Sequence, residues 1–208
     1  MDRGNYAPSA FDSVRKLEEI IAGYAGSRYA VAVDSCTNAL FLSCMYLNIK
    51  GKEVTIPSRT YVSVPCSIIH AGGKVRFEDK DWEGIYRLEP FPIIDGAKRF
   101  RKNMYVPDSY HCLSFHIKKH LKIGRGGMIL TNDKEAYEWF KLARFDGREE
   151  LALHKQEDFR VLGWNYYMTP EQASRGLWLM SMMSDYNEDQ SEDPPYPDLS
   201  KYKIYSQR

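Results

Sequence analysis

Residues 29–34 read Tyr-Ala-Val-Ala-Val-Asp, a short apolar run that ends in a carboxylate. A continuous apolar run of this length is typical of a strand that is buried on both faces of a sheet. It opens a series of strands and helices in alternation, which we expect at 29–34, 37–46, 53–57, 61–71 and 74–78. This alternation predicts an α/β fold with a wound sheet.

Further elements extend the pattern in both directions. Apolar residues at helical spacing predict a helix over 11–24, which Gly26 ends. Short apolar runs predict three more strands, at 92–95, 112–115 and 128–131. Two start signals, Asp133 and the pair Thr169-Pro170, predict helices over 133–144 and 169–183. We therefore expect a mostly parallel sheet flanked by helices.

Length and composition predict the domain organisation. The chain has 208 residues, of which 43% are hydrophobic and 27% are charged, values typical of one globular domain. We place this domain over residues 1–183. From Ser184 the sequence continues as SDYNEDQSEDPPYPD. This acidic, proline-rich composition predicts a flexible tail over residues 184–208.

Charge, apolar run lengths and cysteine spacing exclude several classes of protein. Lys and Arg number 29 against 28 Asp and Glu, so a surface built for nucleic acid is not expected. No apolar run approaches the roughly 20 residues of a membrane span, and the N-terminus has no signal-peptide core, so we expect a cytoplasmic protein. The four cysteines form no CxxC pair and are expected to be reduced. Three histidines share no helix or strand face, so we expect no metal: His111, His116 and His120.

Polar residues follow the ends of several expected strands. Asp95 ends the run Pro-Ile-Ile-Asp, and the turn from Ser35 to Asn38 opens a helix with small polar side chains. A third segment, 114–127, reads SFHIKKHLKIGRGG and ends in a glycine-rich turn. Ligands of open α/β sheets bind at the carboxyl ends of the strands, so these segments are expected to form one crevice. A phosphate cradle, a carboxylate and a lysine are the groups that pyridoxal 5′-phosphate (PLP) needs.

Five motifs, in order along the chain, indicate a family. They are SCTNAL at 35–40, PSRTYVS at 57–63, IDGAK at 94–98, the segment at 114–127, and GWNYYM at 163–168. With these motifs the chain resembles the DegT/StrS family of PLP-dependent nucleotide-sugar aminotransferases, which have the fold-type I architecture. The resemblance covers about residues 10 to 183. It implies the large domain of a fold-type I PLP-transferase.

The resemblance also implies the two catalytic residues. Lys119 would form the internal aldimine with PLP, and Asp95 would bind the pyridine nitrogen. Lys118 is adjacent, but the spacing from Ser114 and Gly124 favours Lys119. Plainer interpretations exist for both residues: a solvated loop lysine for Lys119, and a turn cap for Asp95.

The remaining cofactor-binding residues follow from the same resemblance. Tyr61 would stack on the cofactor ring, although an ordinary core position is an equal alternative. Ser35, Thr37 and Ser114 would bind the cofactor, with Thr37 and Ser114 at its phosphate. Asn165 would reach the phosphate in a neighbouring subunit, because the active sites of the family lie at a dimer interface. A homodimer is therefore expected.

The chain also departs from the family pattern. Cys36 replaces a glycine, Lys98 a glutamine, Arg125 a glutamate and Tyr167 an arginine. Together with the cations of 98–102, 118 and 122, these changes predict a basic crevice or a solvated basic face. Family members are much longer and carry a C-terminal small domain, for which the tail has no room. Only 13 residues lie between Glu78 and Pro92, so we expect a sheet that is one strand short.

Three hypotheses for function result. The first is a PLP-dependent aminotransferase that acts on a nucleotide-linked keto-sugar in amino-sugar biosynthesis, with glutamate as the expected amino donor. The second is a reduced, non-catalytic member of the fold that binds PLP or a nucleotide sugar. The third is a structural or interaction protein that uses its basic face to hold an acidic partner or nucleic acid. The intact pattern at 114–127 favours the first hypothesis.

Overall fold

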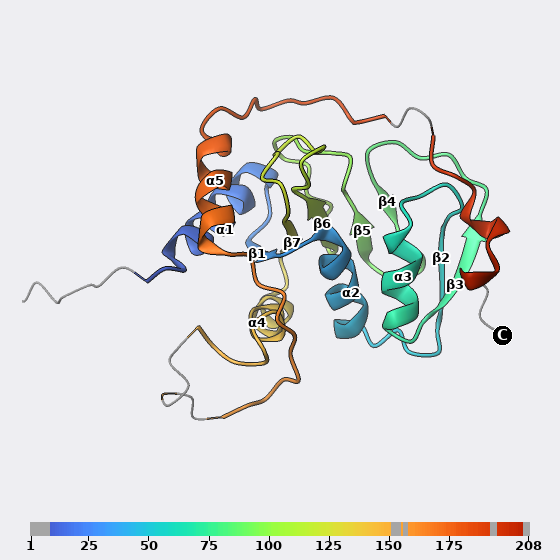
Figure 1. The fold of residues 1–208 in the computed structure, drawn as a ribbon, viewed down its shortest axis with the longest axis horizontal. Coiled ribbons are helices and arrows are strands. Elements are labelled where there is room, and N and C mark those ends of the chain that lie inside the picture. Colours follow the sequence, from blue (N-terminus) through green and yellow to red (C-terminus); the bar gives the residue numbers. More distant parts are fainter. Residues whose placement is uncertain (1–8, 151–154, 156–157, 192–194, 206–208) are drawn as a thin grey trace, which may run out of the picture.

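A computed structural model describes residues 9–150, 155, 158–191 and 195–205 (Figure 1). In chain order the elements are α1 (Asp12–Ala25), β1 (Tyr29–Val33), α2 (Cys36–Tyr46), β2 (Glu53–Pro57), α3 (Ser63–His70), β3 (Lys74–Glu78), β4 (Tyr86–Arg87), β5 (Ile93–Asp95), β6 (Tyr110–Ser114), β7 (Gly127–Thr131), α4 (Lys134–Ala143) and α5 (Pro170–Met180). Two 3₁₀ helices follow, η2 (Leu199–Lys201) and η3 (Lys203–Tyr205). Every strand and helix that the sequence predicts is present, with ends shifted by a few residues; β4, η2 and η3 were not expected.

The main sheet is mixed, which corrects the expectation of a mostly parallel sheet. Its strand order is β1-β7-β6-β5-β4, and β2 and β3 form a separate parallel pair. Within the main sheet only β5 and β6 are parallel, whereas the other three pairings are antiparallel. The reason lies in the connections. Parallel neighbours need a crossover of a dozen or more residues, usually helical, and neither the link from β6 to β7 nor that from β4 to β5 contains a helix.

The short segment between β3 and β5 contains β4 and no helix. Beyond β4, Glu89 forms an antiparallel bridge with Thr55 of β2, through the bonds Thr55 N to Glu89 O at 2.8 Å and Glu89 N to Thr55 O at 3.0 Å. This bridge links the two sheets. The short segment therefore occupies the space between β5 and β2 in place of a longer crossover.

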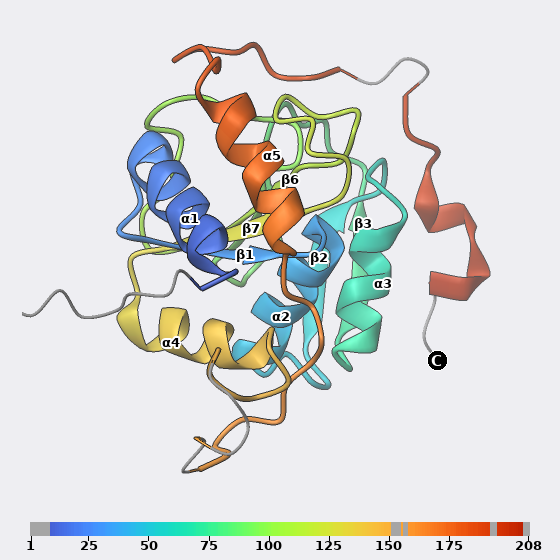
Figure 2. The same cartoon turned by 60° about the vertical axis from the view of Figure 1, so that its left-hand side comes forward.

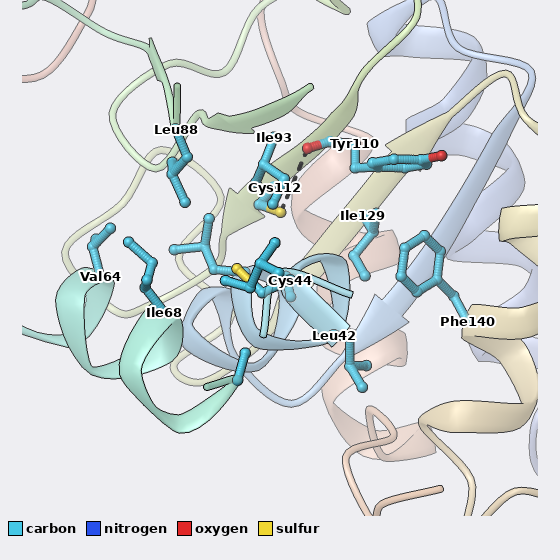
Figure 3. Close-up of a cluster of buried hydrophobic side chains, with 14 of the residues drawn as sticks. Leu42, Cys44, Val64, Ile68, Leu88, Ile93, Tyr110, Cys112, Ile129 and Phe140 are labelled. Atoms are coloured by element: carbon cyan, nitrogen blue, oxygen red, sulfur yellow. Dashed lines mark hydrogen bonds between the residues drawn. The ribbon is translucent and has the colours of Figure 1, made fainter. Parts of the chain in front are cut away.

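Alternation along the strands divides the core into two layers. In β1, Val31 and Val33 belong to the cluster under α2, α3 and α4, whereas Ala30 and Ala32 belong to the cluster under α1 and α5. The first cluster is drawn in Figure 3, where Ile129 of β7 lies beside Phe140 of α4. Figure 2 shows α1 and α5 together on one side of the sheet. The sheet is thus covered on both faces, as the apolar strands predict.

The described residues of the C-terminal segment, for which composition predicts a flexible tail, contact the rest of the domain at several points. From α5 the chain runs across one edge of the domain and reaches β3 on the far side (Figure 1). Leu199 is 1% exposed and its N–H donates to Ser58 O at 2.8 Å. Leu199 and Tyr196 are among the few apolar residues between the acids, and both have partners that are remote in sequence.

Candidate active site

A cavity of about 850 Å³ lies beyond the carboxyl ends of β5 and β6 and beside the first turn of α2. Six of the seven predicted site residues line it: Ser35, Thr37, Tyr61, Asp95, Ser114 and Lys119. They come from four segments of the chain that are far apart in sequence. The topology therefore forms the single crevice that the strand ends predict.

Asp95 is the most buried charged group of the cavity, at 4% exposure. Tyr86 donates its hydroxyl to Asp95 Oδ2 at 2.8 Å, and the Ala97 N–H donates to Oδ1 at 3.0 Å. Burial raises the pKa of Asp95, and these two donors together with the charges of Lys119 and Lys98 oppose the rise. Asp95 is thus more than a turn cap: it is a desolvated carboxylate held in one orientation.

Lys119 lies in the loop between β6 and β7. The Lys119 backbone N–H donates to His116 O at 2.8 Å. Lys119 is partly buried, whereas the neighbouring Lys118 is exposed. Both lysines line the cavity. The charge of Lys119 lowers the pKa of Asp95 and of Cys36. These two residues lie at the inner end of the cavity, the part next to the strand ends and the start of α2.

The turn from β1 into α2 lies at the inner end of the cavity. Ser35 caps α2, because its Oγ accepts from the Asn38 N–H at 3.2 Å, and Thr37 Oγ1 donates to Ser63 Oγ at 2.8 Å. A Cβ at Gly127 would collide with the backbone of Ser35, so this glycine lets β7 approach the turn. A helix N-terminus with free N–H groups and hydroxyls suits a phosphate.

Cys36 takes the first position of α2, where the family pattern has glycine. Burial raises the pKa of its thiol well above the usual range, and the negative charge of Asp95 raises it further. The thiol is therefore protonated at neutral pH and fills space beside Asp95 as a neutral group. All four cysteines are free, as the sequence predicts.

Tyr61 and Asn165 differ in their relation to the cavity. Tyr61 is 55% exposed, which excludes the alternative of an ordinary core position, and it lines the cavity. Asn165 does not line it: the side chain is exposed and donates to Asp146 Oδ2 at 3.2 Å. Within its own chain, Asn165 is therefore separate from the other predicted residues.

The structure adds residues that the sequence analysis did not assign to the site. Tyr86 is buried, and its hydroxyl lies 2.6 Å from Thr60 Oγ1 as well as 2.8 Å from Asp95. Trp82 lines the cavity and contacts the Tyr86 ring edge to face, with 4.6 Å between the ring centroids. Tyr86 begins the two-residue strand β4, which has no sequence signal, and Trp82 lies in the loop before this strand. Their aromatic character was the only available indication.

The expected basic crevice is partly neutralised. Arg99 pairs with Asp189, Lys102 with Asp185 at 3.0 Å, and Arg125 with Asp34 at 2.9 Å. Three cations of the expected cluster line the cavity: Lys98, Lys118 and Arg125. Among the described residues no group of three or more His, Cys, Asp or Glu side chains could hold a metal ion. Within the same residues, no helix is both long and apolar enough to cross a lipid bilayer.

The fold is that of a fold-type I transferase domain. The model of the DegT/DnrJ/EryC1/StrS aminotransferase family matches residues 3–87 and 103–193, and the chain belongs to this family. A solved structure described as a DegT DnrJ EryC1 StrS aminotransferase from Brucella abortus superposes with a TM-score of 0.70 at 21% identity. That match covers 82% of this chain and 58% of the other.

Two relatives illustrate the similarity in sequence. GDP-perosamine synthase of Escherichia coli O157:H7 is 29% identical, over 88% of this chain and 60% of its own length. UDP-4-amino-4,6-dideoxy-N-acetyl-beta-L-altrosamine transaminase of Campylobacter jejuni is 25% identical, over 86% of this chain and 59% of its own length. The chain thus spans less than two thirds of the length of these relatives.

Proposed function

We propose that this protein is a PLP-dependent aminotransferase that acts on a nucleotide-linked keto-sugar in amino-sugar biosynthesis. The observation that carries the proposal is the meeting of Lys119, Asp95 and the Ser35–Thr37 turn in one cavity. Relatives named as a GDP-perosamine synthase and a UDP-sugar transaminase support this class of substrate. Glutamate is the proposed amino donor.

The inner end of the cavity fits PLP on its chemistry. Asp95 is a buried carboxylate whose two hydrogen-bond donors, Tyr86 and Ala97 N–H, carry no formal charge. A protonated pyridine nitrogen would pair with this carboxylate. Ser35, Thr37 and the N-terminus of α2 would bind the phosphate, as would Ser114. When bound, PLP supplies an electron sink for the carbon that loses its proton.

The protein side chains divide the remaining tasks. The Lys119 amine would hold the cofactor covalently and, once released, would move a proton at the reacting carbon. Asp95 would keep the pyridine nitrogen protonated, while Tyr86 would fix the orientation of the carboxylate. Tyr61 would cover the cofactor ring from the exposed side of the cavity.

The assembly and the location of the protein are part of the same proposal. We propose a homodimer in which Asn165 reaches the phosphate site of the partner; its exposure and its absence from the lining of its own cavity support this. Residues 1–183 would form the large transferase domain. Four free cysteines support a reducing compartment, here the cytoplasm. Light scattering of the PLP-loaded protein tests the dimer, and a monomer at micromolar concentration would contradict it.

Substitution of the two neighbouring lysines tests the cofactor site. The full chain is loaded with PLP, reduced with borohydride and mapped by peptide mass. We expect the label on Lys119, no label in Lys119→Ala, and full labelling in the matched control Lys118→Ala. A label on Lys118, or one that persists in Lys119→Ala, would contradict the assignment. Turnover with glutamate and a nucleotide-linked keto-sugar then tests the reaction.

A second candidate is a family member that binds PLP without turnover. It is favoured by the C-terminal residues 189–191 and Tyr196, which line the cavity that a substrate must enter. Labelling of Lys119 without any transfer of an amino group would support this candidate over the first. The interaction-protein hypothesis is weaker, because Arg99, Lys102 and Arg125 already pair within the chain.

A further inference from the structure

The C-terminal strap, defined as residues 184–191 and 195–205, contacts several loops that surround the cavity. Its described residues pass beside the loop after β5 and the lysine loop before β7, and end next to β3 (Figure 1). None of the predicted site residues lies on it. The proposed function assigns no role to the strap, although Asp189, Gln190, Ser191 and Tyr196 line the cavity.

The loop after β5 holds the strap through a paired ion contact. Arg99 donates through Nε to Asp189 Oδ1 at 2.8 Å and through a terminal nitrogen to Oδ2. The Asp189 side chain is only 5% exposed. A Cβ at Gly84, where φ is +67°, would collide with the Asp189 carboxylate. The carboxylate is therefore held between Arg99 on one side and Gly84 on the other.

Backbone contacts fix the strap at further points. The Gln190 N–H donates to Lys98 O at 2.9 Å, and Gln190 Nε2 donates to Lys118 O at 3.0 Å. His120 Nε2 lies 2.7 Å from Glu188 O. On the far side of the cavity, buried Leu199 is anchored at Ser58 O. The strap is thus attached on both sides of the cavity mouth.

This path brings Tyr196 to the outer half of the cavity, the part that is lined by Tyr61, Trp82, Lys98 and the strap. Its ring centroid lies 6.2 Å from that of Tyr61 and 6.5 Å from that of Trp82, with the Trp82 ring nearly parallel at 12°. Lys98 Nζ lies 4.6 Å from the Tyr196 centroid and 4.8 Å from the Trp82 centroid. The outer half therefore combines three aromatic rings with a buried cation.

Such a surface fits the distal part of the proposed substrate. A nucleobase is planar and stacks on aromatic rings, and a diphosphate is attracted to an ammonium group. The inner half, in contrast, carries the polar groups that suit PLP. A ligand that spans the cavity would therefore place its sugar carbonyl toward Lys119 and its nucleoside diphosphate toward the strap.

We propose that the strap forms a nucleoside-diphosphate subsite in which Tyr196 is a nucleobase-binding residue, positioned by the ion pair between Arg99 and Asp189. This inference rests on the proposed function for the direction in which the substrate lies. It assigns the outer wall of the active site to a segment that sequence composition describes as a tail.

Nucleotide binding to the PLP-loaded full chain tests the subsite, with UDP and GDP as calorimetric probes. We expect Tyr196→Ala to weaken binding of the preferred nucleotide about 10-fold, the order expected for loss of one stacked ring. Tyr196→Phe keeps the ring and should stay within about twofold of wild type. The matched control Tyr202→Ala removes a tyrosine of the strap that is 51% exposed and does not line the cavity, and should change nothing.

Exchange of the charges of Arg99 and Asp189 tests whether this ion pair positions Tyr196. Arg99→Asp and Asp189→Arg should each weaken nucleotide binding as much as Tyr196→Ala does, and the double variant should recover most of the loss. Melting temperatures of all variants show whether the fold persists. If both single variants unfold, the Tyr196 series still decides the proposal.

The other outcomes overturn the inference in distinguishable ways. Tighter nucleotide binding by Tyr196→Ala would mean that the strap blocks the cavity. Equal binding by wild type and Tyr196→Ala would mean that the subsite lies elsewhere. If Lys119 carries PLP but wild type binds neither probe, the subsite fails and the cofactor assignment stands. If nucleotide binding depends on Tyr196 but no PLP attaches, the subsite stands and the proposed function fails.

Discussion

The inner and outer halves of the cavity are built in different ways. The inner half takes its groups from strand ends and a helix start, where Asp95, Ser35 and Ser114 follow directly from apolar runs. The outer half takes Tyr196 and Asp189 from the strap, and these residues meet Trp82 and Arg99 only through long-range contacts. Local sequence therefore determines the inner half, and the path of the chain determines the outer half.

The two carboxylates of the cavity show the same difference. Asp95 is desolvated among neutral donors, and burial raises its pKa. Asp189 is also largely buried, but the hydrogen bond from Arg99 is the main cause that lowers its pKa. The proposed function assigns the first carboxylate to a cation of the cofactor, whereas the second already pairs with Arg99 within the protein. Three experiments use this contrast.

The largest expected effect is on the inner half. Asp95→Asn removes the negative charge while it keeps the shape of the side chain, so PLP affinity should fall about 10- to 100-fold, the value of a charged hydrogen bond. An absorbance titration with PLP measures this. Asp108→Asn is the matched control, because Asp108 is exposed and adopts φ +55°, which asparagine also tolerates. Wild-type affinity in Asp95→Asn would remove Asp95 from the cofactor site.

An effect confined to the strap is expected on the outer half. Leu199→Ala truncates a side chain that is 1% exposed and should lower the free energy of local opening of the strap by about 2 kcal/mol. Amide hydrogen exchange over residues 195–205 measures the opening. PLP attachment should not change. The control Ile204→Ala acts on a side chain that is 82% exposed, and an equal effect there would contradict an anchoring role for Leu199.

The smallest effect is a difference between the pH values at which the carboxylates of the two halves become protonated. Because the pKa of Asp95 is raised and that of Asp189 is lowered, acidification from neutral pH protonates Asp95 first. Protonation removes the cost of the buried charge, so the unliganded fold loses no stability there, but a bound pyridinium loses its partner. The Asp189 contact stabilises the fold above its unfolded pKa of about 3.9 and is lost only as pH falls through the lower folded value.

PLP absorbance and Trp fluorescence, followed together over pH, measure this separation. Protonation of Asp95 in the unliganded protein competes with PLP, so we expect the PLP affinity to fall at a higher pH than the pH at which the strap opens. Opening of the strap before PLP is lost would contradict the assignment of the two carboxylates to different roles.

Several features were predictable because they depend on neighbours in sequence. The α5 start shows this: Thr169 caps the helix, Gln172 completes the capping box and Pro170 takes the first turn. The positions of Asp95 and Ser35 at element ends followed from apolar run lengths in the same way. The direction of β7 did not, because antiparallel pairing with β1 and β6 depends on a connection without a helix.

Tyr86 and the strap could not be predicted from local sequence. Tyr86 reaches Asp95 because the two residues pair across β4 and β5, and a strand of two residues has no detectable period. The strap has the composition of a disordered segment, so only its distant partners reveal that it folds back.

The sequence by itself determined the family, the order of the strands and helices, and the identity of the groups at the inner end of the cavity, because apolar periodicity and motif spacing are local properties. Only the tertiary structure decided the mixed sheet, the partner of Asp95 and the contribution of the strap to the outer wall of the cavity. Those features arise from contacts such as Arg99 with Asp189 and Lys98 with Tyr196, about 90 residues or more apart in the chain. No local pattern encodes which distant residues will meet; the packing of the whole chain does.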